Sequence, residues 1–92
     1  MGLMSDEDVR TALGALPGWR REGDGIVREF TFDDFAGSIG FVNRLAEIAE
    51  AENHHPDIAI SWATVAVTWT SHSAGGITDT DLVMASATDS LG

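Results

Sequence analysis

The chain has 92 residues, of which 43% are hydrophobic, and this length and apolar content suit one domain spanning residues 1–92. It contains no cysteine, which excludes disulfides, thiol nucleophiles, iron–sulfur clusters and zinc sites that use cysteine. Fifteen acidic residues against five basic ones give a net charge of −10, which disfavours direct nucleic-acid binding because the phosphate backbone repels such a surface.

The first third of the sequence predicts a helix followed by a strand. Ser5, with Asp8 three residues later, has the form of a capping box, and apolar residues then recur at helical spacing until Pro17 stops the run. A polar turn is expected over 21–25. The alternation over 26–32 is typical of a strand.

The middle of the sequence predicts a long helix. Asp33 or Asp34 can cap it, and it should end near Asn53 because Pro56 cannot continue the helical hydrogen bonds. Its apolar stripe is expected to comprise Phe35, Ile39, Val42, Ala46 and Ala49, widened by Phe41, Leu45 and Ile48.

The last third predicts strands and a closing helix. Alternation over 58–62 and 64–70 indicates two strands, or one long strand with a break between them. Thr78 and Asp81 repeat the capping-box pattern before the final helix. The whole order predicts an α+β fold in which helices pack on one face of a small antiparallel sheet of three to four strands.

We expect a soluble, cytoplasmic protein without membrane attachment. The N-terminal segment lacks the basic start and apolar stretch of a signal peptide, and no run approaches the ~18 apolar residues of a membrane span. A chain this short buries a limited share of its surface, so we also expect support from oligomerisation.

All three histidines of the chain, His54, His55 and His72, lie within 19 residues of one another. Histidine is the side chain best suited to move protons near neutral pH, so the grouping indicates acid–base chemistry. The structural alternative for His54 and His55 is a polar helix C-terminus, where the helix dipole stabilises a positively charged imidazolium. On its strand, His72 is expected on the face opposite the apolar residues.

A zinc site is the competing use of these histidines, since three imidazoles and a carboxylate can hold a catalytic zinc ion. Helical zinc sites place histidines at i and i+4, whereas adjacent residues such as His54 and His55 point in different directions. The spacing therefore argues against a metal.

Three further residues have a structural and a functional interpretation. Asp81 can simply complete a capping box with Thr78. Glu50 precedes His54 by one helical turn, so its carboxylate can orient that imidazole or remain solvated. Trp62 can belong to the core or form an aromatic wall beside a planar ligand.

These residues together resemble a known family, pterin-4a-carbinolamine dehydratase. The resemblance rests on the string EAENHHP at 50–56, the aromatic Trp62, His72, and the segment from Gly75-Gly76 to Asp81. Earlier segments that look like the same family are Gly18-Trp19, residues 30–32 and residues 34–41.

The resemblance implies a hydro-lyase that converts 4a-hydroxytetrahydropterin to quinonoid dihydropterin, in recycling of a tetrahydrobiopterin-type cofactor used by aromatic amino-acid hydroxylases. It implies a pterin substrate, no cofactor, and a four-stranded antiparallel sheet with helices on one side in a dimer or tetramer. The residues leave open which histidine is the acid and which the base. By resemblance, the catalytic residues are His54, His55 and His72, and the substrate-binding or orienting residues are Glu50, Pro56, Trp62 and Asp81.

Two other functions compete with the dehydratase. Relatives of this fold serve as a dimerisation cofactor for a homeodomain transcription factor and as a Rubisco assembly factor, so a non-catalytic interaction protein is the main alternative. A small metal-dependent hydrolase is the minor one. Retention of all three histidines favours catalysis, since a scaffold has no chemical need for them.

Overall fold

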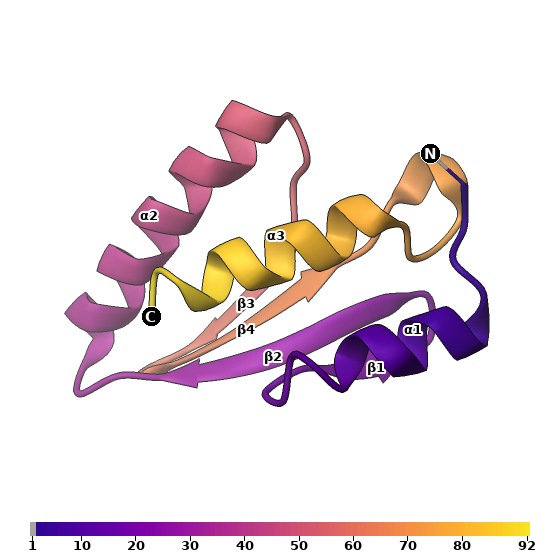
Figure 1. Cartoon of the computed structure of the whole chain (residues 1–92). Helices are drawn as coiled ribbons and strands as arrows, with labels where there is room; N and C mark the ends of the chain where they lie inside the picture. The colour runs from indigo at the N-terminus through magenta and orange to yellow at the C-terminus, as the bar shows by residue number, and fades with distance from the viewer. Residues whose placement is uncertain (1) are drawn as a thin grey trace.

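The computed structural model describes residues 2–92, which form one four-stranded antiparallel sheet and three α-helices. The strand order is β1-β2-β4-β3, and α2 and α3 lie over one face of the sheet while α1 lies beside β1 (Figure 1). All three helices contribute to the single cluster of buried apolar residues that lies against the sheet. The expected α+β fold is therefore confirmed, with four strands.

The N-terminal helix α1 spans Asp6–Leu13 and begins as predicted, because Ser5 Oγ accepts a hydrogen bond from the Asp8 amide at 3.1 Å. It packs through Val9, which is buried in the core. The helix ends at Gly14, before the expected stop at Pro17.

The prediction of a polar turn over 21–25 is wrong in part. Strand β1 (Arg20–Glu22) pairs with β2 (Gly25–Thr31), and only residues 23 and 24 make the turn between them. All three residues of β1 are exposed, so no alternation of apolar and polar residues marks it in the sequence. Its structure depends on the hydrogen bonds that β2 offers along the sheet edge.

Helix α2 spans Phe35–Glu52 and is capped by Asp34, whose Oδ1 accepts from the Gly37 amide at 2.8 Å. The predicted stripe is rotated relative to the real one: Phe35 is 52% exposed and Ala46 is exposed. The residues that α2 buries are Ser38, Phe41, Leu45 and Ala49. Phe41 and Leu45, expected at the margin, thus lie at the centre of the face that meets the sheet.

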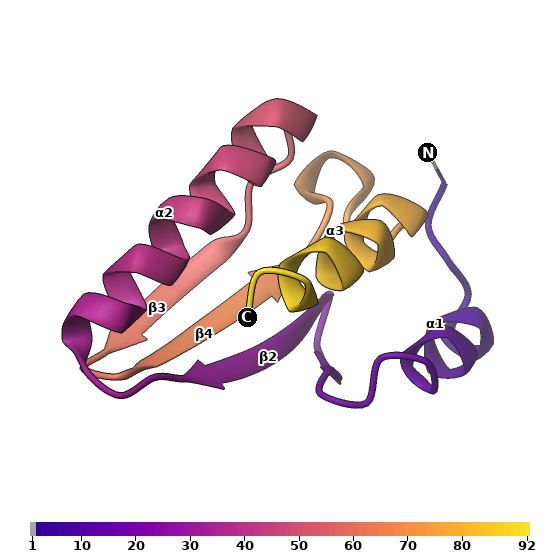
Figure 2. The same ribbon diagram turned by 60° about the vertical axis from the view of Figure 1, so that its left-hand side comes forward.

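The two-strand interpretation of the following segment is confirmed. Strands β3 (Asp57–Ser61) and β4 (Thr64–Trp69) form a hairpin whose turn includes Trp62 with a φ of 51°. β4 lies in the middle of the sheet and buries every second residue, whereas β3 is an exposed edge strand. Figure 2 shows β3 running beneath α2 from one end of the sheet to the other.

A short 3₁₀ helix, η1 (His72–Ala74), follows β4 and leads into α3 (Asp79–Asp89). The predicted capping box is present at Thr78 and Asp81. Trp69, the last residue of β4, is fully buried and donates its indole N–H to Thr88 Oγ1 of α3 at 3.0 Å. This contact fixes α3 against the end of β4, where the histidines lie.

Within residues 2–92, no helix combines the length and the apolar character needed to cross a membrane.

Candidate active site

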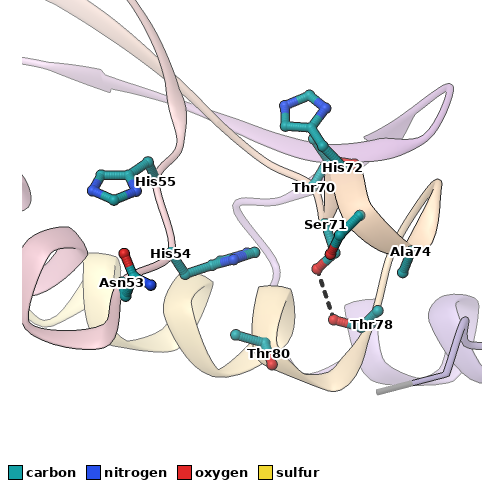
Figure 3. A pocket seen from close by; sticks show the side chains of 10 residues that line it. Asn53, His54, His55, Thr70, Ser71, His72, Ala74, Thr78 and Thr80 are labelled. Atoms are coloured by element: carbon teal, nitrogen blue, oxygen red, sulfur yellow. Dashed lines mark hydrogen bonds between the residues drawn. The ribbon is translucent and has the colours of Figure 1, made fainter.

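The three histidines line one open hollow of about 400 Å³ at the end of β4 (Figure 3). Residues 53–55 form one side of it, and residues 70–74 form the other. Thr78 and Thr80, at the start of α3, complete the lining. Two segments that are separated by β3 and β4 in the sequence thus meet here because α2 and β4 end at the same edge of the molecule.

The end of α2 directs His54 and His55 toward this hollow. Asn53 adopts a left-handed conformation (φ 50°), and the His54 amide donates to the Ala49 carbonyl at 3.1 Å. This is the usual way to close a helix, and asparagine tolerates it better than most residues. Pro56 then leads into β3. It is half-buried and does not line the hollow, so its contribution is to hold the backbone at His55 in an extended conformation.

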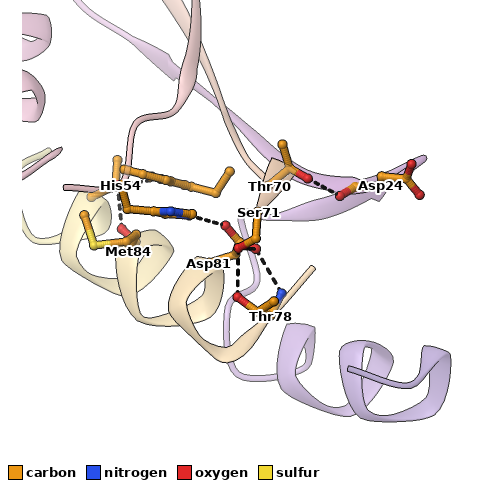
Figure 4. Close-up of polar contacts among 9 residues, drawn as sticks. Asp24, His54, Thr70, Ser71, Thr78, Asp81 and Met84 are labelled. Carbon is orange, nitrogen blue, oxygen red and sulfur yellow. Dashed lines mark hydrogen bonds and ion pairs between the residues drawn. The ribbon is translucent and has the colours of Figure 1, made fainter. Parts of the chain in front are cut away.

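His54 is the most constrained of the three imidazoles. Its Nε2 lies 2.6 Å from Oδ1 of Asp81, and its side chain is 18% exposed while that of Asp81 is fully buried. The ring also stacks on Trp69, with 5.5 Å between ring centroids and 10° between the planes. Figure 4 shows the imidazole beside the Asp81 carboxylate.

Asp81 is the centre of a buried hydrogen-bond network. Its Oδ2 accepts from the Thr78 amide at 2.9 Å and from the Ser71 hydroxyl at 2.9 Å, and the hydroxyls of Ser71 and Thr78 lie 2.8 Å apart. The capping-box interpretation of Asp81 is confirmed, and its functional interpretation remains a prediction. The same carboxylate caps α3 and contacts His54.

Sequence reasoning missed Ser71. It continues the inward-facing series Val65, Val67 and Trp69 of β4, all of which are fully buried, and it is itself only 8% exposed. A hydroxyl at the next position of such an apolar series must find a hydrogen-bond partner inside the protein. That break in the pattern is the signal that could have identified it.

The sequence left open whether Glu50 orients the His54 imidazole or remains solvated, and in the structure its mostly exposed carboxylate pairs with His55 Nε2 and not with His54. The i, i+4 argument assumes that the helix continues to residue 54, whereas it ends at Glu52 and the chain turns at Asn53. Both side chains of the pair are mostly exposed, at 55% for His55 and 76% for Glu50. Solvent screening makes this contact a weak constraint.

His72 faces the hollow from the η1 side and is exposed. In the part of the chain that the structure describes, the hydrogen bonds to imidazole nitrogens involve His54 and His55, and none involves His72. The three histidines therefore differ in environment: His54 is mostly buried and held by Asp81, His55 is exposed and paired with Glu50, and His72 is exposed without a hydrogen bond to its ring among the described residues.

Trp62 does not form a wall of this hollow. It lies in the β3–β4 turn, is 72% exposed, and is absent from the lining. β3 begins beside the histidines and runs away from them, so its five residues carry the chain roughly 16 Å from the hollow before Trp62 is reached. Closeness in sequence was misleading here because the intervening segment is extended.

Among residues 2–92, no group of three or more His, Cys, Asp or Glu side chains is arranged to hold a metal ion. Nε2 of His54 faces the Asp81 carboxylate, so this ring nitrogen is already engaged by a protein group.

Comparisons with known proteins agree on one family. The sequence model of a family described as Pterin 4 alpha carbinolamine dehydratase matches residues 2–91. A Mycobacteroides abscessus protein named for pterin-4-alpha-carbinolamine dehydratase is 51% identical over 89 residues, which cover 97% of this chain and 95% of that protein.

Two solved structures share the fold. A Brucella melitensis protein described as a transcriptional coactivator/pterin dehydratase is 33% identical, with a TM-score of 0.91 over 96% of each chain. A pterin dehydratase-like protein described as a RuBisCO assembly factor of the alpha-carboxysome is 22% identical, with a TM-score of 0.65 over 79% of this chain and 84% of that one. The second likeness is one of fold alone.

Proposed function

Because the chain belongs to the pterin-4a-carbinolamine dehydratase family, we propose that it dehydrates 4a-hydroxytetrahydropterin to quinonoid dihydropterin by histidine acid–base catalysis. The observation that carries the proposal is the convergence of His54, His55 and His72 on one hollow. No other histidine is available in the sequence, so the chain places its whole supply of neutral-pH proton carriers at this site.

The reaction requires two proton transfers and no change of oxidation state. One group takes the proton from the pterin ring nitrogen, and the electrons of that N–H bond form the C=N bond while the C–O bond at the neighbouring carbon breaks. Another group delivers a proton to the departing hydroxyl, which leaves as water. Imidazoles on two sides of one hollow can perform both transfers on a substrate bound between them.

The environments of the histidines suit different parts of this task. His54 has its Nε2 engaged by a buried carboxylate, as in catalytic triads, where the acidic group orients the imidazole. His72 has no such partner among the described residues and can turn toward the substrate from the opposite side. His55, exposed and paired with Glu50, is suited to exchange protons with solvent.

We further propose that the chain needs no cofactor or metal, and that it acts as a homodimer or homotetramer in recycling of a tetrahydrobiopterin-type cofactor. Large apolar side chains left exposed in one chain support the assembly: Leu3, Phe35, Ile58, Ile60, Trp62 and Val83. An assembly role like that of the RuBisCO factor has no support beyond the shared fold.

His72→Ala tests the proposal with little risk to folding. We expect kcat for dehydration, followed by ultraviolet absorbance, to fall roughly a hundredfold, since the variant removes one proton-transfer group. The midpoint of thermal unfolding should not change, because the exposed ring makes no hydrogen bond within residues 2–92. Wild-type turnover in a folded His72→Ala protein would remove His72 from the mechanism.

A further inference from the structure

Ser71 connects the two sides of the hollow. Its side chain reaches Asp81, which holds His54 on one side, while its backbone closes the loop that carries His72 on the other. The Ser71 amide donates to the Gly76 carbonyl at 2.9 Å, and the Gly76 amide donates back at 3.2 Å. Ser71 therefore contributes to the placement of both imidazoles, through its side chain for His54 and through its backbone for His72.

The hydroxyl of Ser71 acts both as donor and as acceptor within the buried network. Its single proton goes to Asp81 Oδ2, so the hydroxyl of Thr78, 2.8 Å away, must donate to Ser71 Oγ. Both residues are buried. The result is a one-way chain of hydrogen bonds that runs from Thr78 through Ser71 to the carboxylate (Figure 4).

The direction of this chain determines what Asp81 can offer to His54. Oδ2 is occupied by two donors, the Ser71 hydroxyl and the Thr78 amide, which leaves Oδ1 to accept from Nε2 of His54. A carboxylate that accepts on both oxygens keeps the His54 proton at Nε2. In the neutral imidazole, Nδ1 is then the nitrogen with a free lone pair.

We propose that Ser71 is a positioning residue whose hydroxyl fixes the orientation of the Asp81 carboxylate and so holds His54 in the tautomer that leaves Nδ1 free to exchange a proton. This inference rests on the proposed function for its catalytic consequence, but the tautomer itself is a property of the unliganded protein.

A matched control separates positioning from loss of a buried hydroxyl in general. Ser38 is fully buried in α2, and its Oγ donates to the Trp62 carbonyl at 2.8 Å. This contact lies at the β3–β4 turn, at the opposite end of β3 from the histidines. Ser38→Ala therefore removes a comparable hydrogen bond without touching Asp81. Ser71→Thr is the conservative variant, because it retains the hydroxyl.

The direct test measures the ring nitrogens of His54 by ¹⁵N NMR without pterin, at alkaline pH so that neutral imidazoles are observed. We expect one protonated and one unprotonated nitrogen in the wild type, in Ser38→Ala and in Ser71→Thr. In Ser71→Ala the two shifts should move toward each other as both tautomers become populated. The signals of His72 should not move, because its loop is closed by the backbone of Ser71.

Turnover provides the second readout. Ser71→Ala should lower kcat roughly tenfold to a hundredfold, as loss of a residue behind a functional histidine commonly does, with KM little changed. Ser71→Thr should recover most of that loss, and Ser38→Ala should match the wild type. If Ser71→Ala does not fold, Ser71→Cys replaces it, since a thiol of similar shape is only a weak donor.

The outcomes are distinguishable from failure of the dehydratase proposal. Unchanged His54 shifts in folded Ser71→Ala or Ser71→Cys would overturn the positioning role, whatever the turnover. A wild type that does not dehydrate 4a-hydroxypterin would overturn the proposed function, while the NMR comparison would still decide whether Ser71 controls the tautomer.

Discussion

Replacing His54 with alanine is expected to lower kcat for 4a-hydroxypterin dehydration by roughly 10²- to 10⁴-fold, the range that one general acid or base contributes. The residue faces the hollow, and it alone among the three histidines has a fully buried carboxylate behind it. The change also leaves that carboxylate without its imidazole partner, so the free energy of unfolding should fall as well. Absorbance kinetics and urea unfolding would measure the two effects separately.

His54→Gln distinguishes catalysis from folding at this position. The glutamine amide can donate to Asp81 Oδ1 in place of Nε2, yet it cannot carry a proton between the substrate and the protein. We expect His54→Gln to be more stable than His54→Ala, with a free energy of unfolding closer to that of the wild type. Its turnover should be as low as that of His54→Ala. Substantial turnover in His54→Gln would show that proton exchange at this residue is dispensable.

The second large effect is expected in the free energy of unfolding. Asp81→Ala removes the acceptor of three hydrogen bonds, from His54, Ser71 and the Thr78 amide, all at a fully buried position. Loss of one partner from a buried polar network of this kind costs about 3 to 5 kcal/mol. Urea unfolding followed by circular dichroism would give the difference, with turnover lost in parallel because His54 is no longer oriented.

Asp79→Ala is the matched control for that variant. Asp79 lies in the same first turn of α3 and is exposed, so its loss removes a similar charge near the helix N-terminus without opening the network. We expect its stability to stay within about 0.5 kcal/mol of the wild type. Equal destabilisation by the two substitutions would mean that Asp81 acts through the helix dipole alone.

Much of the fold follows from local patterns in the sequence. Caps at Ser5, Asp34 and Thr78 begin the three helices where expected, because each side chain or its partner satisfies amides at a helix start. β1 could not be predicted, since an exposed edge strand has no apolar alternation and forms only when β2 is beside it. The rotation of α2 was equally hidden, because so many of its residues are apolar that several stripes fit the sequence.

The candidate site shows a similar division. The histidine group could be recognised from residue type and resemblance, and the structure brings its members to one hollow. The partners of these histidines depend on tertiary geometry: a left-handed Asn53 sends His55 to Glu50 and His54 to Asp81. Spacing in the sequence does not show where the chain turns, and the turn at Asn53 determines which carboxylate each of these two histidines contacts.

The most direct test of the account is the rate of 4a-hydroxypterin dehydration by the purified wild-type protein, measured by ultraviolet absorbance with and without a metal chelator. The account predicts a rate well above that of buffer and unchanged by the chelator, because the proton transfers are assigned to imidazoles alone. A rate equal to that of buffer in a folded protein would contradict the dehydratase function. A rate abolished by the chelator would contradict catalysis by the histidines without a metal.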